Sequence, residues 1–272
     1  MKNFQKIIKY CALAFAIVLI IGIFKFAVGG LLFVGSFFFD TNQKAEALVE
    51  REMSFDFDNY DNLDIKTTVS RLTIKTGEQF SVVTNNKDIT MKERKDTIVI
   101  RDNRKPNYYN YNRDLELIVT LPAYTTLDSV TIDAGAGRVY IDELNCRKAN
   151  IDLGAGEVEI NKINVTNEIK LSGGIGELTI HDGRLNNLDA DLGVGSFKAT
   201  LSLTGRNKID AGVGEVSLNL LDSYKNYIFN VDKGLGDIKL DRNSIQSGVY
   251  GDGIHAVDIS GGVGEIKVST RN

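Results

Sequence analysis

The sequence has no tryptophan, and histidine, proline and cysteine occur only twice each in its 272 residues. The shortage of histidine removes the side chain that enzymes most often use as a general base. With two prolines against 26 glycines, the turns must rely on the backbone freedom of glycine. Cys11 lies in an apolar run expected to enter a membrane, so it cannot pair with Cys146, and a disulfide scaffold is excluded.

A concentrated positive charge is also missing. The formal net charge is -4 and the pI is near 5.4, which argues against a nucleic-acid partner, because such proteins carry a basic face. The Gly-x-Gly pairs lack the third glycine of a dinucleotide fingerprint, and His181 and His255 fall at different phases of the repeat described below. We therefore expect no nucleic-acid partner, no cofactor and no metal site.

The amino terminus has the pattern of a membrane anchor. Three lysines precede an apolar stretch that runs from Tyr10 to Phe39 with one interruption at Lys25. A helix needs about 20 apolar residues to span a bilayer, and a lysine near its end can reach the interface. We predict that residues 1–39 hold a single-pass transmembrane helix. Its amino end stays in the cytoplasm, because the positive charges precede the span, and the rest of the chain is outside.

A cleaved signal peptide is the alternative interpretation of the same segment. Ala27-Val28-Gly29 would supply a small-x-small cleavage site. A second apolar run follows this site, however, which favours an anchor that is retained. Both interpretations place the later residues outside the cytoplasm. Residues 40–52 are polar and predict a linker between the anchor and the rest of the chain.

A Gly-apolar-Gly motif recurs seven times in the second half of the sequence. The second glycines are separated by 19, 20, 19, 19, 22 and 28 residues, and internal periods of this size indicate a solenoid. Glycines at these positions permit a sharp bend of the backbone, which predicts a structural turn in each repeat. The turn glycines are Gly135 and Gly137, Gly154 and Gly156, Gly174 and Gly176, Gly193 and Gly195, Gly212 and Gly214, Gly234 and Gly236, and Gly262 and Gly264.

The residues around each glycine pair align as well. Apolar and polar positions alternate on both sides of the pair, which predicts two short strands that each bury one face. An Asp or Ser two positions before the first glycine could accept a hydrogen bond from a turn amide. Strands of successive coils would pair at about 4.8 Å. The sequence therefore predicts an all-β fold, a single-stranded, β-helix-like solenoid with 19–20 residues per coil, over residues 132–272.

Residues 53–131 are rich in strand patterns but less regular. Val69–Ile74 looks like a degenerate copy of the motif, with Thr68 and Ser70 in place of the glycines. We expect this part to cap the open end of the solenoid, since exposed strand edges invite aggregation. The longest interval between repeats contains Asp241–Gly253, which is predicted to bulge out as a loop.

The run Leu117–Pro122, the strand pattern Leu127–Ile132 and the repeated Asp/Ser-x-Gly-apolar-Gly motif resemble a bacterial putative-adhesin family of β-strand-repeat domains. The resemblance covers roughly residues 55–268. It implies an extracytoplasmic, often membrane-anchored domain, and some members of the family sit beside envelope-stress regulators in Gram-positive bacteria. Because the family is largely uncharacterised, the resemblance bears on fold and location far more than on activity.

Two acidic columns of the repeat could carry chemistry. Stacked carboxylates after the second glycine could bind Ca²⁺; the opposing interpretation is a solvated face whose charge is offset by Lys and Arg. The column of Asp residues before the first glycine could serve a β-helical glycosidase or lyase. An active site is a single constellation, however, whereas a column repeated in every coil serves the turn. We therefore expect no catalysis.

The remaining candidate is a polar segment from Asn103 to Arg113. It contains Tyr108, Tyr109 and Tyr111, and aromatic side chains often anchor protein and sugar contacts, so these three mark a candidate binding surface; a plain surface loop is the alternative. The predicted function is a surface scaffold or interaction module that binds an envelope protein or glycan. The alternative is a carbohydrate-active β-helix enzyme with its site in the Asp241–Gly253 insertion.

Overall fold

The computed structural model describes residues 51–54, 60–104 and 115–271. The predicted anchor and the three tyrosines lie outside these ranges, as does the predicted linker except for Arg51 and Glu52. The chain divides into the units Met1–Glu46 and Ala47–Asn272, and the described residues all belong to the second. Among the residues described, no helix is both long and apolar enough to cross a bilayer.

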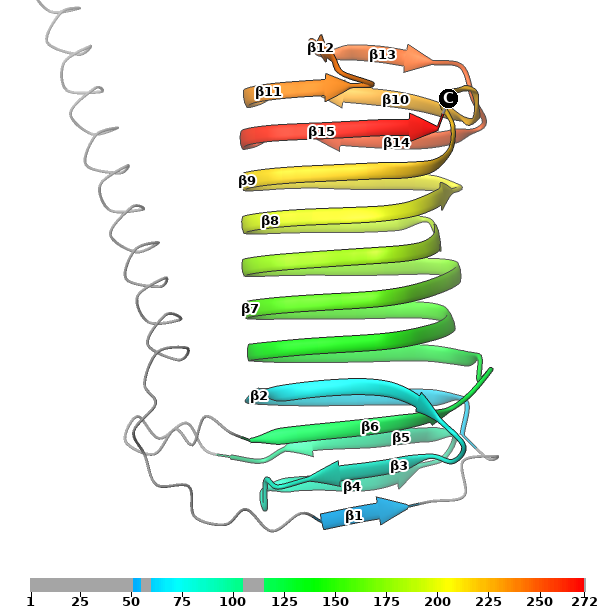
Figure 1. Cartoon of the computed structure of the whole chain (residues 1–272), viewed down its shortest axis with the longest axis vertical. Coiled ribbons are helices and arrows are strands. Elements are labelled where there is room, and N and C mark those ends of the chain that lie inside the picture. The colour runs from blue at the N-terminus through cyan, green and yellow to red at the C-terminus, as the bar shows by residue number, and fades with distance from the viewer. Residues whose placement is uncertain (1–50, 55–59, 105–114, 272) are drawn as a thin grey trace, which may run out of the picture. The chain divides into compact units, whose positions relative to one another are not determined.

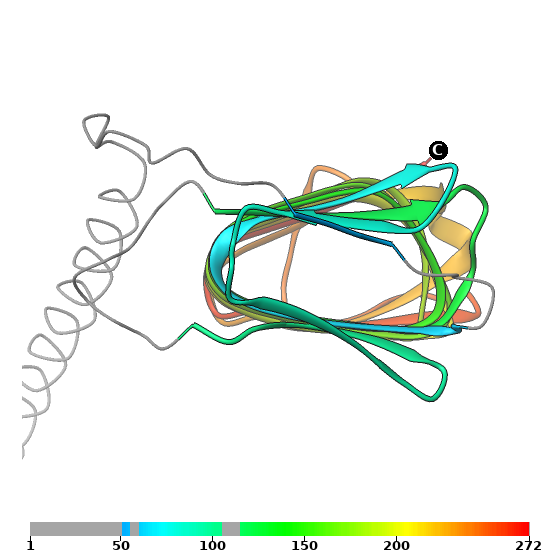
Figure 2. The ribbon, with the colours of Figure 1, turned by 90° about the horizontal axis from the view of Figure 1, so that it is seen from below.

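The second unit is a stack of β-coils. β7 (Leu127–Asn186), β8 (Leu188–Thr204) and β9 (Arg206–Ser223) wind upward in order, as Figure 1 shows. Each coil pairs in parallel with the next, so that Gly176 lies opposite Gly195 and Gly195 opposite Gly214. Seen along the stack, every coil is a flattened oval with two long sides and a tight bend at one end (Figure 2). The predicted all-β repeat is confirmed, and its coils lie in register.

The core fills the space between the two long sides. The inward positions of both strands are apolar in every repeat, and Ile132, Val139 and Ile141 illustrate them with exposures of 0–4%. Because side chains alternate across a strand, the same column is buried in coil after coil. Full burial of one such side chain contributes about 1.5–3 kcal/mol. A single coil exposes both edges of this core, so the stack is stable only as a whole.

At the amino-terminal end, the first coil in the chain is not the outermost coil of the stack. β2 (Asn62–Gly77) is a coil, with Val69 opposite Ala136 and Ser70 opposite Gly137 of β7, so the degenerate copy of the motif does occupy a corner. β5 (Thr97–Asp102) and β6 (Glu116–Pro122) form a further coil on its other side. The antiparallel strands β4 (Ile89–Arg94), β3 (Ser81–Thr84) and β1 (Arg51–Ser54) then cover that coil.

The carboxyl-terminal end departs from the predicted order. β9 is followed by the short 3-10 turn η2 (Tyr224–Asn226) and then by β10 (Tyr227–Asp232) and β11 (Leu235–Leu240). The coil that β10 and β11 form does not pair with β9, and one further coil fits between them. β14 (His255–Ser260) and β15 (Val263–Arg271) fill this space. β14 pairs with both β9 and β10, and β15 with both β9 and β11. The last corner of the sequence is therefore the second to last in the stack.

The Asp241–Gly253 insertion is not the bulging loop that was predicted. β12 (Asn243–Ile245) pairs antiparallel with β11, and β13 (Gly248–Gly251) pairs antiparallel with β10. These two strands cover the outermost coil. The physical reason is the same at both ends of the stack, because an uncovered parallel edge would offer its backbone groups to other chains. At the carboxyl-terminal end the chain forms the outer coil first, then covers it with β12 and β13, and finally returns past it as β14 and β15.

Candidate functional site: the glycine corner and its flanking columns

The tight bend of each coil requires glycine for two separate reasons. The second glycine of a pair has a positive φ, as in Gly195 at +147°, a conformation that L side chains rarely adopt. A Cβ on Gly195 would also overlap the carbonyl oxygen of Gly176 in the coil below. The first glycine of the pair, Gly193, has the same overlap with Gly174 but no positive φ. Positive φ occurs at Gly137, Gly156, Gly176, Gly195, Gly214 and Gly264, and Gly236 is the exception.

The residue between the two glycines points outward. In the order of the stack these residues are Ala136, Ala155, Ile175, Val194, Val213, Val263 and Leu235, and we call this line the corner ridge. Exposure rises along it, with Val194 at 36%, Val213 at 44%, Val263 at 49% and Leu235 at 79%. The sequence pattern does not separate this column from the buried ones. The difference arises because a residue at the apex of a convex bend faces away from the core.

The Asp or Ser column lies on one side of the corner ridge. Asp133 forms an ion pair with Lys66 of β2, and Asp210 forms one with Lys208 of its own strand. The hydrogen bond from Lys208 holds the pKa of the Asp210 carboxyl below its usual value. Side chains, namely Lys66 for Asp133 and both Lys208 and Ser260 for Asp210, are thus the partners described for these two carboxylates in place of the expected turn amides.

The column after the second glycine lies on the other side of the ridge, and cations interleave it. Glu157 pairs with Arg138 at 3.0 Å and Glu177 with Lys198 at 2.8 Å. Glu265 accepts hydrogen bonds from two lysines, Lys239 and Lys267, which lower the pKa of its carboxyl. Within the described ranges, no three His, Cys, Asp or Glu residues group as metal ligands would. The geometry is that of a charged outer face with alternating signs.

The insertion proposed for catalysis contains two acidic residues, Asp241 and Asp252, and the first of them has partners in β15. Asp241 accepts hydrogen bonds from the Thr270 backbone N–H at 2.7 Å and from its hydroxyl at 2.9 Å. These bonds fasten the end of β15 to the cap. Arg242 has a positive φ of 71° at the tight turn between β11 and β12, and its side chain is exposed. Asp241 therefore holds the last strand of the chain in place.

The two histidines lie on different coils. His181 contacts Glu159 at 2.9 Å on the outer surface. His255 accepts a hydrogen bond from the Gly205 backbone N–H at 3.2 Å through Nδ1 and lies beside the ring of Tyr227. Tyr227 is fully buried and its hydroxyl donates to Asp222. His255 and Tyr227 thus help to pack the turn where the last coil enters the stack.

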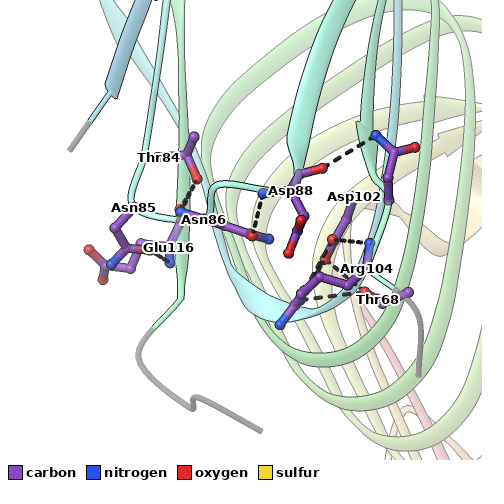
Figure 3. A network of polar contacts seen from close by, with 9 residues as sticks. Thr68, Thr84, Asn85, Asn86, Asp88, Asp102, Arg104 and Glu116 are labelled. Atoms are coloured by element: carbon purple, nitrogen blue, oxygen red, sulfur yellow. Dashed lines mark hydrogen bonds and ion pairs between the residues drawn. The ribbon is translucent and has the colours of Figure 1, made fainter. Parts of the chain in front are cut away.

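A polar network near the amino-terminal cap has no signature in the sequence (Figure 3). Asp102, whose side chain is 0% exposed, forms an ion pair with Arg104 at 2.5 Å and accepts the Thr68 hydroxyl at 2.7 Å. Burial opposes ionisation of Asp102, but these hydrogen bonds outweigh it and keep the pKa of its carboxyl below the usual value. Thr68 stands where the next coil has its first glycine.

Polar contacts hold the described residues on both sides of the tyrosine segment. Asp102 ends β5 and Glu116 begins β6, so the tyrosine segment lies in the sequence between the two strands of one coil. On the far side, Asn85 accepts the Glu116 backbone N–H at 2.8 Å and the Thr84 hydroxyl donates to the Glu116 carbonyl at 2.6 Å. Both roots of the segment are thereby held, while the tyrosines themselves lie outside the described residues.

Two hollows accompany these columns. A cavity of about 70 Å³ follows the inner side of the corner, lined by the turn glycines and by apolar side chains such as Leu178 and Phe197, so it offers a ligand few polar partners. A wider surface hollow of about 670 Å³ is lined by polar side chains that include Asn164 and Asn186. Their amides already donate to Asn145 and to the Thr166 carbonyl of neighbouring coils.

These features define a class: an all-β solenoid with glycine corners, charged outer faces and both ends capped. The sequence matches the family described as Toastrack DUF4097 over residues 60–269, and the chain belongs to this family. No curated protein matches the chain.

The comparison with solved structures finds two bacterial proteins whose names refer to adhesion. A "putative cell adhesion protein" from Clostridium sporogenes is 16% identical, with a TM-score of 0.39 over 82% of this chain and 99% of its own. A "putative adhesin" from Bacteroides fragilis is 15% identical, with a TM-score of 0.38 over 84% of this chain and 100% of its own.

Proposed function

We propose that this protein is a membrane-anchored, extracytoplasmic scaffold that presents the sides of a rigid β-stack to a partner in the cell envelope, in the manner of an adhesin. The observation that supports the proposal is a capped Toastrack stack that follows an apolar amino-terminal stretch of the length a bilayer requires. Such a stack holds repeated side chains at fixed spacing, which suits recognition of an extended partner.

The repeated columns are better suited to binding than to turnover. Hydrolysis of a glycosidic bond needs two carboxylates at a defined separation around one bond. The carboxylates of the second column are instead paired with lysine or arginine, as Glu177 is with Lys198. Asp241, the acidic residue that opens the late insertion, is bound to Thr270. A scaffold without catalysis therefore fits the described side chains better than a carbohydrate-active enzyme.

The location can be tested with a single exposed thiol. Tyr124, at the turn before β7, is 98% exposed, so Tyr124→Cys in intact cells should react with a membrane-impermeant maleimide. The parent chain supplies the control, because Cys146 is 1% exposed and burial raises the pKa of its thiol to about 12, while Cys11 falls within the predicted membrane span. Labelling of Tyr124→Cys only after cell lysis would contradict an extracytoplasmic location.

The scaffold role can be tested with the purified unit Ala47–Asn272. We expect it to be retained on immobilised cell-envelope fractions and to leave a panel of envelope polysaccharides uncleaved. The fraction retained and the release of reducing ends measure the two properties separately. Cleavage at enzyme-like rates would overturn the proposal in favour of the carbohydrate-active alternative.

A further inference from the structure

The upper part of the corner ridge is an exposed aliphatic line without cover among the described residues. From Ile175 to Leu235 it contains one branched aliphatic side chain per coil, and exposure reaches 79% at its end. Scattered apolar residues on a surface are ordinary, but a contiguous line is typical of an interaction site. The lower part differs, because Ala136 and Ala155 offer much less apolar surface.

Carboxylates border this aliphatic line on both sides. The columns next to it contain no lysine or arginine beside these five coils; their acidic members are Asp191, Asp210 and Asp232 on one side and Glu177, Glu215, Glu265 and Asp237 on the other. Lys198 and Lys267, which pair with carboxylates of the second column, stand one outward position further from the ridge. Lys233 is different, because it directly precedes Gly234 in the corner and pairs with Asp237 at 3.7 Å. Asp191 and Asp232 form no ion pair within the part of the chain that the structure describes. The other rim carboxylates are paired with lysines, so the excess negative charge of the rim comes from Asp191 and Asp232.

We propose that this aliphatic line is the docking site of a cationic amphipathic helix from a partner protein. Five coils at about 4.8 Å span roughly 19 Å, which equals the length of a helix of about 13 residues. The helix would lie parallel to the stack, since its pitch of about 5.4 Å nearly matches the coil spacing. Its apolar stripe would cover Val194, Val213 and Val263, and lysines or arginines beside the stripe would face the carboxylates.

Two other partners, an anionic bilayer and a second copy of the chain, fit the aliphatic line less well than a cationic helix does. A bilayer surface with anionic lipids would be repelled by the carboxylates. A second copy of the chain would contribute the same line, one side chain wide, whereas a stable interface buries about 800 Å² on each partner. The proposal rests on the scaffold role proposed above and names the chemistry of the partner.

The test uses the unit Ala47–Asn272, which is compact and contains the whole described core. The probe is an 18-residue helical peptide with a leucine stripe flanked by lysines. We expect it to bind with an affinity that falls as salt is added, because the rim contributes through charge. A peptide with the same composition but a scrambled stripe, and one with glutamate in place of lysine, should not bind.

Three protein variants locate the site. Val194→Thr, Val213→Thr and Val263→Thr together keep the branched β-carbon and strand preference but should weaken binding at least about tenfold through lost apolar contact. Asp191→Asn with Asp232→Asn should weaken binding and flatten its salt dependence. Val249→Thr is the matched control, because Val249 is 65% exposed on β13 away from the ridge, and its binding should be unchanged.

The proposal is overturned if the triple valine variant binds the helical peptide as tightly as the parent does. It is also overturned if the parent binds the scrambled peptide or anionic vesicles as tightly as the helical peptide. The full chain in a zwitterionic nanodisc should bind the helical peptide as well. If the unit Ala47–Asn272 binds it and the full chain does not, residues 1–46 cover the aliphatic line and the proposal is wrong. If the triple variant still adheres to envelope fractions, the scaffold role stands and this docking site fails alone.

Discussion

Replacing the corner glycines one at a time separates the two demands that the bend makes on the backbone. Gly195→Ala meets both a positive φ of +147° and an overlap with the Gly176 carbonyl. Gly193→Ala meets only the overlap with Gly174, and Gly173→Ala meets neither, since its nearest neighbour would be the Leu192 methyl at 3.9 Å. The three variants add the same methyl group within two consecutive coils.

The magnitudes follow from these differences. A side chain at an unfavourable φ costs about 1–3 kcal/mol, and displacing the ladder carbonyl loses a hydrogen bond of about 1 kcal/mol, so Gly195→Ala should lower the free energy of unfolding by about 2–4 kcal/mol. Gly193→Ala should cost about 1–3 kcal/mol through overpacking alone. Gly173→Ala should be neutral or stabilise by about 0.4–1 kcal/mol, because it restricts the unfolded chain.

Urea denaturation and thermal unfolding of the unit Ala47–Asn272, followed by circular dichroism, measure the series. A domain of this size shifts its Tm by about 2–4 °C per kcal/mol, so Gly195→Ala should lower the Tm by about 5–15 °C. Destabilisation should follow the order Gly195, Gly193, Gly173. If Gly195→Ala unfolds at the parent temperature, or if Gly173→Ala costs as much as Gly195→Ala, the corner geometry described above is wrong.

Two other regions give predictions of their own. Asp102→Asn should destabilise the protein at neutral pH by about 3 kcal/mol, because it leaves the Arg104 guanidinium without its carboxylate. The lowered pKa of Asp102 makes its contribution present above the unfolded pKa of about 4 and lost as pH falls through the folded value, so the difference from the parent in urea melts should shrink below about pH 4; a constant difference would contradict this assignment. Deleting residues 254–272 should lower the Tm far more than deleting residues 47–59, because β14 and β15 pair on both sides whereas β1 pairs only with β3; equal losses would mean that the last coil lies at the end of the stack.

The regular part of the fold is readable from the sequence because its cause is local. Alternation around Gly193 and Gly195 requires two strands and a bend, and repetition of the same pattern requires stacking. Even the degenerate coil at Val69 and Ser70 keeps enough of the pattern to be aligned with β7. Wherever one coil's residues alone decide its shape, the sequence predicts the structure.

The order of the last two coils is different, because it depends on neighbours. The corners at Gly236 and Gly264 have the same local pattern, so either could follow β9. Pairing of β12 and β13 with β11 and β10 covers one of them, and only this long-range choice sends the other inside. The Asp102 network escapes prediction for the same reason, since its partner Thr68 is 34 positions away. Val213 points outward because the backbone is convex at the corner, and the apolar character of its side chain gives no sign of this.

The covered ends have a consequence for how such a protein can change its height. Antiparallel strands cover the outer coil at each end of the stack, so a coil added beyond either end would meet an antiparallel strand instead of an open parallel edge. A duplication within the uninterrupted run from Leu127 to Ser223, by contrast, adds a coil whose two faces match those of its neighbours. The distance between the two caps can therefore vary by whole coils while both ends stay unchanged.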